Sequence, residues 1–158
     1  MTTPERGGGN LYVMADKTRG TISIQAPVAS VQAILFDIGE YPAWSTAIKS
    51  VDVITKDDMG RITSATLTVD AGMMKDRVTL DYDWGAAPTR LEFSLSQADL
   101  LTAMDGAYVI TAADDETTTV SYELTVSLSL PIPAIMRRKA EQTTIDLALN
   151  QLKIRAEK

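Results

Sequence analysis

From Pro133 to Ala156 the chain contains no glycine and no further proline, so nothing in this segment interrupts a helix. At 1.5 Å per residue, such a helix would be about 36 Å long. It carries one apolar stripe, which consists of Ile135, Met136, Ala140, Ile145, Ala148, Leu149 and Leu152. A helix of this length needs an extended surface to cover, and this requirement restricts the possible folds more than any other feature of the sequence.

A sheet supplies that surface, because alternating apolar and polar residues predict strands over 18–25, 49–56, 61–71, 76–84, 89–96, 101–112 and 117–129. The clearest is 76–84, where Val78, Leu80, Tyr82 and Trp84 share one face. Gly106 indicates a bulge in the sixth strand. Two short helices are expected after the first strand, at 28–36 and 41–44. Short turns between consecutive strands favour antiparallel pairing, so the predicted class is α+β in two layers.

The 158 residues suffice for a single domain with its own core. Residues 1–16, with three consecutive glycines, are expected to be a flexible extension, and 17–158 to form the domain. Met1 and Met14 are both possible starts. The first residues lack the apolar stretch of a signal peptide, and no apolar run is long enough for a transmembrane segment. We therefore expect a cytoplasmic protein.

The chain has no cysteine and no histidine. This excludes Cys-based metal sites and the Ser-His-Asp and Cys-His catalytic arrangements, and no cofactor or metal is expected. The net charge of −6 disfavours nucleic acid as a partner. The charge is unevenly distributed along the chain. Residues 137–158 carry six Lys/Arg and three Asp/Glu, whereas residues 1–136 carry nine Lys/Arg and eighteen Asp/Glu. Arg137, Arg138 and Lys139 lie at the positive end of the predicted helix, so we expect an anionic group beside them, on the protein or on a ligand.

Four segments resemble the START-like superfamily, the polyketide cyclase/dehydrase and lipid-transport (SRPBCC) proteins. They are IQAPVASVQAILFDIGEYPAW at 24–44, DYDW at 81–84, DLLTAMDGAYVIT at 99–111 and TTTVSYELTVSLSLPIPAIMRRKAE at 117–141. The resemblance implies a helix-grip fold, in which a curved seven-stranded antiparallel sheet wraps around the C-terminal helix. It also implies an apolar cavity between the sheet and that helix.

The resemblance favours binding, transport or sequestration of a small hydrophobic or amphipathic ligand such as a lipid, a quinone or a polyketide. A cyclase or dehydratase that confines its substrate is the first alternative, weakened by the absence of histidine. An interaction protein with a filled core is the second. The oligomeric state is left open.

The candidate ligand-binding residues lie on the inward phase of the strands and on the segments expected to border the ends of the cavity. They are Tyr41, Trp44, Met73, Leu80, Tyr82, Trp84, Phe93, Tyr108, Tyr122 and Met136. Each could equally be part of a filled core. Asp81 and Asp83 face outward, so a paired-carboxylate catalytic site is not expected there, and of the three carboxylates on this strand only Asp76 falls on the inward phase.

Overall fold

A computed structural model describes residues 17–72 and 75–158. The predicted extension 1–16 and Met73 therefore lie outside the described residues. The strands are β2 (Thr18–Ile24), β3 (Ile48–Lys56), β4 (Ile62–Asp70), β5 (Lys75–Asp83), β6 (Arg90–Ala98), β7 (Leu101–Asp114) and β8 (Thr117–Leu128). The helices are α2 (Val28–Phe36), the 3-10 turn η1 (Ile38–Glu40), α3 (Tyr41–Trp44) and α4 (Ala134–Ala156).

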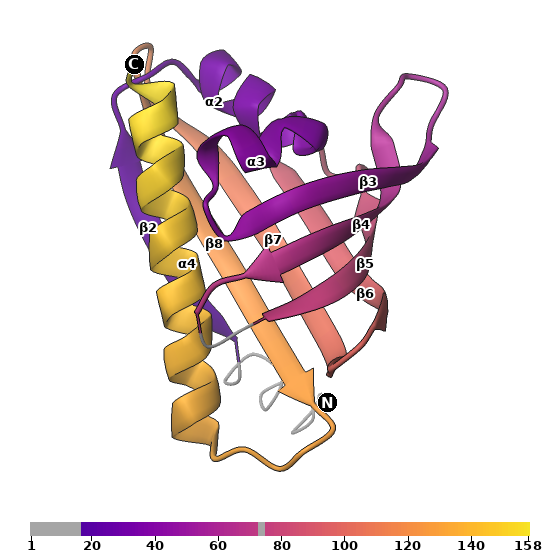
Figure 1. Ribbon diagram of the computed structural model, residues 1–158. Coiled ribbons are helices and arrows are strands. Elements are labelled where there is room, and N and C mark those ends of the chain that lie inside the picture. Colours follow the sequence, from indigo (N-terminus) through magenta and orange to yellow (C-terminus); the bar gives the residue numbers. More distant parts are fainter. Residues whose placement is uncertain (1–16, 73–74) are drawn as a thin grey trace, which may run out of the picture.

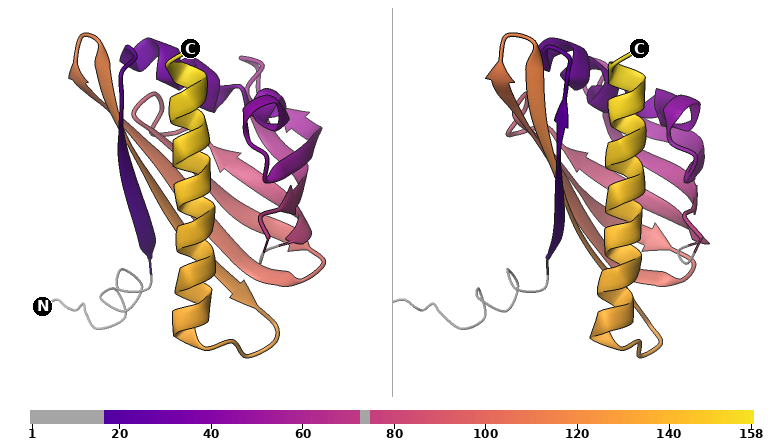
Figure 2. Two further views of the ribbon diagram at one scale, coloured as in Figure 1. Left: turned by 60° about the vertical axis from the view of Figure 1, so that its left-hand side comes forward. Right: turned by 90° about the vertical axis from the view of Figure 1, so that its left-hand side faces the viewer.

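The seven strands form one antiparallel sheet in the order β2-β8-β7-β6-β5-β4-β3. The sheet curves around α4, which runs along β2 and β8, and the short helices α2 and α3 cover one end of the sheet (Figures 1 and 2). This is the predicted helix-grip architecture, and it is confirmed. Among the described residues, no helix is long and apolar enough to cross a membrane.

The packed face of α4 consists of Glu141, Ile145, Leu149 and Leu152, all of which are buried. Gly20 of β2 allows the helix to approach closely, because a Cβ atom there would lie 2.6 Å from Cγ2 of Ile145. The first two residues of the predicted stripe behave differently. Ile135 and Met136 are exposed, and the first turn of α4 lies at the end of the sheet, after the connection from β8 (Figure 1).

Glu141 is a carboxylate on this otherwise apolar interface. It accepts a hydrogen bond from Oγ1 of Thr18 at 2.5 Å and one from the backbone N–H of Val126 at 2.7 Å, and Nη1 of Arg137 lies 3.9 Å away. The carboxylate thus links α4 to both strands beneath it. Arg137, one of the three cations at the start of the helix, has this anionic group on the protein itself.

The predicted bulge at Gly106 is wrong. The pairing of β7 is regular there, opposite Phe93 on β6 and Leu124 on β8, and the register shifts lie at Leu101/Ala103 and Ala112/Asp114. Gly106 serves a different purpose, because the ring of Phe93 lies directly over its Cα and any side chain at this position would collide with that ring.

Candidate ligand-binding site

An inner chamber lies between the concave face of the sheet, α3 and α4. Its volume is about 60 Å³. Since one water molecule needs about 10–15 Å³ on this measure, the chamber has room for a few waters or one small chemical group. Its walls are mostly apolar and aromatic: Tyr41, Trp44, Ser45, Ala47, Ile48, Leu67, Val69, Leu80, Tyr82, Phe93, Met104, Tyr108, Tyr122, Thr144 and Ala148.

Aromatic rings form a connected series across the chamber wall. Tyr108 and Tyr122 face each other across β7 and β8 and stack with centroids 4.2 Å apart. Phe93 lies 6.3 Å from Tyr122 and 6.1 Å from Tyr82. Such ring contacts add to the stability that burial alone gives and hold each ring in one orientation. The rings therefore support one another across the wall.

The tyrosine hydroxyls of the wall are uncharged at neutral pH. Burial raises the pKa of Tyr41, Tyr82, Tyr108 and Tyr122 above the ordinary tyrosine value. The hydroxyl of Tyr41 donates a 2.7 Å hydrogen bond to the carbonyl of Leu35, which joins α3 to the end of α2.

Trp44 contributes a polar atom that has no hydrogen-bond partner. Its indole Nε1 is buried and has no hydrogen-bond partner, and it is the one such side-chain atom among the described residues. A buried donor without an acceptor costs about 1–3 kcal/mol, so most are satisfied in folded proteins. The ring itself is held edge-on against Tyr41, with centroids 5.2 Å apart.

A wider pocket of about 610 Å³ lies next to the chamber, at the end of the sheet where α4 begins. It is lined by the starts of β5 and α4, the β6–β7 turn and the connection from β8, and Met136 belongs to it. The two spaces adjoin: Met104 of the chamber pairs with Val126 of the pocket across β7 and β8, and Val69 pairs with Asp76. We call this wider pocket the mouth.

The carboxylate of Asp76, in the wall of the mouth, has a structural role. It accepts hydrogen bonds from the backbone N–H groups of Asp99, Leu100 and Leu101, the last at 2.8 Å. It thereby fixes the turn between β6 and β7. These contacts account for a carboxylate on the inward phase of β5 without assigning it any catalytic role.

The structure brings together seven of the ten predicted ligand-binding residues around the chamber: Tyr41, Trp44, Leu80, Tyr82, Phe93, Tyr108 and Tyr122. Met136 lies in the mouth, and Met73 lies outside the described residues. Trp84 is buried elsewhere, where its Nε1 donates to the carbonyl of Ile62 at 2.8 Å and its ring meets Phe36 edge-on. Trp84 is not brought to the chamber.

Sequence reasoning missed the contribution of α4 to the chamber. Thr144 and Ala148 line it, and Ala140, one turn earlier, lines the mouth. These small residues recur every four positions and thus lie on one face of the helix. The spacing of these small residues in the sequence could have predicted this lining, because small residues on a helix face that points toward a sheet leave space between the two layers.

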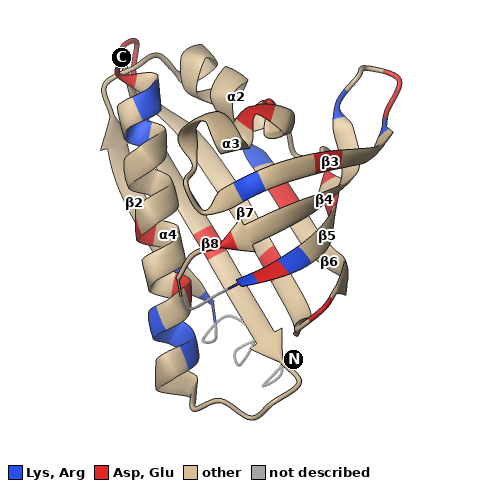
Figure 3. Ribbon diagram, in the orientation of Figure 1, with Lys and Arg blue, Asp and Glu red and all other residues tan. Residues whose placement is uncertain are grey.

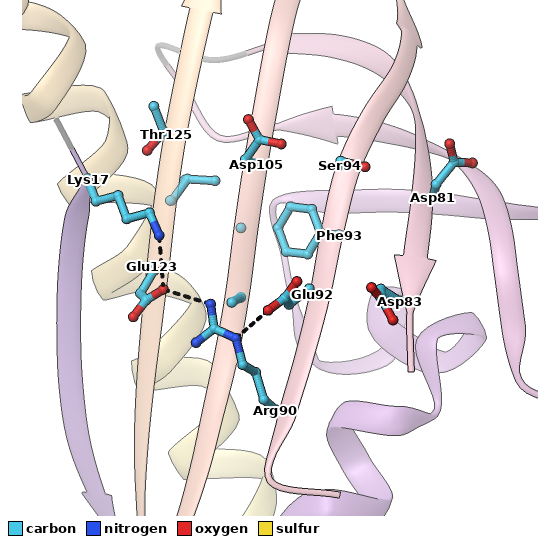
Figure 4. Close-up of a pocket in the computed structure, with 13 residues that line it drawn as sticks. Lys17, Asp81, Asp83, Arg90, Glu92, Phe93, Ser94, Asp105, Glu123 and Thr125 are labelled. Atoms are coloured by element: carbon cyan, nitrogen blue, oxygen red, sulfur yellow. Dashed lines mark hydrogen bonds and ion pairs between the residues drawn. The ribbon is translucent and has the colours of Figure 1, made fainter. Parts of the chain in front are cut away.

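The opposite, convex face of the sheet carries a polar pocket of about 220 Å³ (Figure 4). Glu123 lies at its centre and forms three ion pairs. Its carboxylate oxygens lie 2.7 Å from Nη2 of Arg19, 3.2 Å from Nη2 of Arg90 and 3.9 Å from Nζ of Lys17. Asp81 and Asp83 line this outer pocket, away from the chamber, as the strand phase predicts. Within residues 17–72 and 75–158, no cluster of three or more carboxylates suits a metal ion.

Comparison with protein families gives one match, to "Polyketide cyclase / dehydrase and lipid transport", over residues 15–157. Comparison with curated proteins gives none. Solved structures with the same fold include a START superfamily protein from Mycobacterium smegmatis, with 22% identity, a TM-score of 0.84, and coverage of 89% of this chain and 97% of that one. The Zhui aromatase/cyclase from Streptomyces sp. R1128 has 16% identity, a TM-score of 0.71, and coverage of 89% and 93%.

Proposed function

The chain belongs to the polyketide cyclase, dehydrase and lipid transport family, and from that premise we propose that it binds one uncharged hydrophobic molecule that carries a carbonyl or similar oxygen acceptor. The oxygen-bearing end occupies the chamber beside Trp44. The apolar remainder extends toward the mouth. Quinones and polyketide-type ketones have this chemistry.

The observation that carries the proposal is that Trp44, which lines the chamber, has a buried indole N–H without a hydrogen-bond partner. A ligand oxygen that accepted this hydrogen bond would remove the cost of the unsatisfied donor, and that gain would add to the affinity. A pure hydrocarbon of the same shape would leave the donor unsatisfied. The site should therefore prefer oxygenated ligands.

The neutrality of the wall supports an uncharged ligand. The described residues around the chamber include no Asp, Glu, Lys or Arg. A carboxylate or ammonium placed there would lose its hydration without meeting an opposite charge, which costs far more than burying a neutral carbonyl. A charged group could be accommodated at the mouth, where Lys75 and Arg137 lie.

The volumes support a ligand that spans both spaces. The chamber, at about 60 Å³, suits only the end of a molecule, whereas the mouth, at about 610 Å³, is in the range of small-molecule sites. The adjoining wall residues Met104, Val126 and Val69 lie where the ligand would pass between the two.

A cyclase or dehydratase function is the second candidate, favoured by the neutral phenols of Tyr108 and Tyr122. Such hydroxyls can donate to a carbonyl oxygen as it gains negative charge. Proton abstraction from carbon also needs a base, and the described wall offers no carboxylate or histidine for it. Binding is therefore the function that the site supports better.

Two matched compounds test the proposal: 2-methyl-1,4-naphthoquinone and 2-methylnaphthalene, which differ in two carbonyl oxygens. We expect the quinone to bind the full-length protein with one-to-one stoichiometry and about tenfold or more tighter than the hydrocarbon. Trp44→Phe removes the indole N–H and keeps an aromatic ring, so it should abolish that difference and leave hydrocarbon binding unchanged. Trp84→Phe is the control, and equal affinity of the wild type for both compounds would contradict the proposal.

A further inference from the structure

One end of the molecule exposes a cluster of large apolar side chains. Ile135 is 78% exposed and Leu130 is 74% exposed, in the first turn of α4 and in the connection that precedes it. Leu100, in the neighbouring β6–β7 turn, is 59% exposed. The cluster, which we call the apolar end, comprises Leu100, Leu128, Leu130, Ile132, Ile135 and Met136. Clusters of this kind on a soluble domain mark a surface that binds something.

Cations lie beside the apolar end. Arg137, Arg138 and Lys139 follow it directly on α4, and Lys75 begins β5 in the wall of the mouth (Figure 3). Of the carboxylates near this end, Glu141 is buried under α4 and Asp76 holds the β6–β7 turn, while Asp99 is exposed beside Leu100 in that turn. The remainder of the chain is acidic, with nine Lys/Arg against eighteen Asp/Glu in residues 1–136.

We propose that the apolar end docks onto the surface of a membrane that contains anionic phospholipid. Leu130, Ile132 and Ile135 would enter the boundary between headgroups and acyl chains, as the apolar residues of interfacial segments do. Arg138 and Lys139 would lie at the level of the headgroup phosphates, where each cation contributes to the attraction.

The distribution of charge selects this partner over a second copy of the chain. In a symmetric dimer the same patch meets itself, so the cations of one copy would face those of the other. An anionic lipid surface attracts the same cations. It also repels the acidic body, and this repulsion would orient the molecule with the apolar end toward the bilayer.

Docking in this orientation would place the mouth against the membrane, because Leu100, Leu130, Ile132 and Met136 belong to both. A hydrophobic ligand could then pass between bilayer and pocket without crossing water. Docking itself stands independently of the chamber ligand, because it rests only on the exposed residues and the cations of this end.

Co-flotation with vesicles tests the proposal on the full-length protein without added ligand. We expect binding to vesicles of phosphatidylcholine mixed with phosphatidylserine and at least tenfold weaker binding to phosphatidylcholine alone. The double variant Leu130→Ser/Ile135→Ser and the double variant Arg138→Gln/Lys139→Gln should each weaken binding to the anionic vesicles by roughly tenfold or more.

Matched controls come from other exposed positions. Ile54→Ser/Met59→Ser removes two exposed apolar residues from the β3–β4 hairpin, and Arg155→Gln/Lys158→Gln removes two cations from the other end of α4. Both controls should bind as the wild type does. If a control loses as much affinity for the anionic vesicles as its test variant does, the proposal is overturned. Equal binding of the wild type to vesicles with and without phosphatidylserine also overturns it.

Sedimentation velocity separates the second copy from the membrane. A wild-type dimer that Leu130→Ser/Ile135→Ser converts to monomer would show that another chain covers the apolar end, and it would overturn membrane docking. Quinone binding in solution is measured separately, without vesicles. A failure of docking therefore leaves the proposed ligand site standing, and a failure of quinone binding leaves docking standing.

Discussion

The carboxylate of Glu141 accepts a hydrogen bond from the backbone N–H of Val126 at 2.7 Å, at a point where the helix residue is wholly buried. This contact joins the long helix to the strand beside it, and the bond from Thr18 joins the same carboxylate to β2. Both bonds lie inside an otherwise apolar interface, so the carboxylate ties α4 to the two strands that it covers.

We expect Glu141→Ala to lower the free energy of unfolding by about 2–4 kcal/mol, because it leaves the buried N–H of Val126 without an acceptor. Asp146→Ala is the matched control, since Asp146 is an exposed carboxylate on the same helix and should cost less than about 0.5 kcal/mol. Urea unfolding measures both. Similar losses in the two variants would contradict a role for Glu141 in holding the helix.

Gly106→Ala is expected to destabilise the protein by about 1–3 kcal/mol, because its methyl group meets the ring of Phe93 and must displace it. Gly39→Ala is the control, since the nearest atom to a Cβ there is 4.0 Å away. The displaced ring borders the chamber, so quinone affinity should fall in Gly106→Ala as well. Equal stability of the two variants would show that the close approach of ring and glycine is not required.

The buried tyrosines predict a specific response to alkali. Since the pKa of Tyr41, Tyr82, Tyr108 and Tyr122 is raised in the folded state, the folded protein retains protons that the unfolded chain releases above pH of about 10. Their contribution is therefore fully present below that pH, and it is lost as the pH rises toward the folded pKa values.

The absorbance of phenolate measures this directly. Four of the five tyrosines should ionise only as the chain unfolds, in step with the loss of circular dichroism in an alkaline titration. The same titration in concentrated urea should show all of them ionising near the ordinary value. Ionisation of these four near pH 10 in protein that is still folded would contradict their burial in the chamber wall.

Strand parity could be read from the sequence because successive side chains of a strand point to opposite faces. It correctly placed Leu80, Tyr82 and Phe93 inward and Asp81 and Asp83 outward. Parity says nothing, however, about position along a strand. Trp84 shares its face with Tyr82, yet it lies past the chamber and packs under α2, because the space depends on where α3 and α4 cover the sheet.

Two other features depend on tertiary packing. Leu101 is buried although its parity differs from that of Met104 and Tyr108, because a register shift lies between Leu101 and Ala103. Gly106 suggested a bulge by its residue type alone, whereas its partner across the ladder, Phe93, requires the empty space above it. Neither relationship is visible without knowing which residues face each other.

The two tryptophans allow the most direct test of the proposed ligand site, because each gives one indole N–H signal in a nitrogen–proton NMR spectrum. Trp84 already donates to the carbonyl of Ile62, whereas the N–H of Trp44 has no partner. Titration with 2-methyl-1,4-naphthoquinone should shift the Trp44 signal downfield, as a new hydrogen bond requires, and leave the Trp84 signal in place. Saturation with quinone while the Trp44 signal stays unmoved would contradict the account.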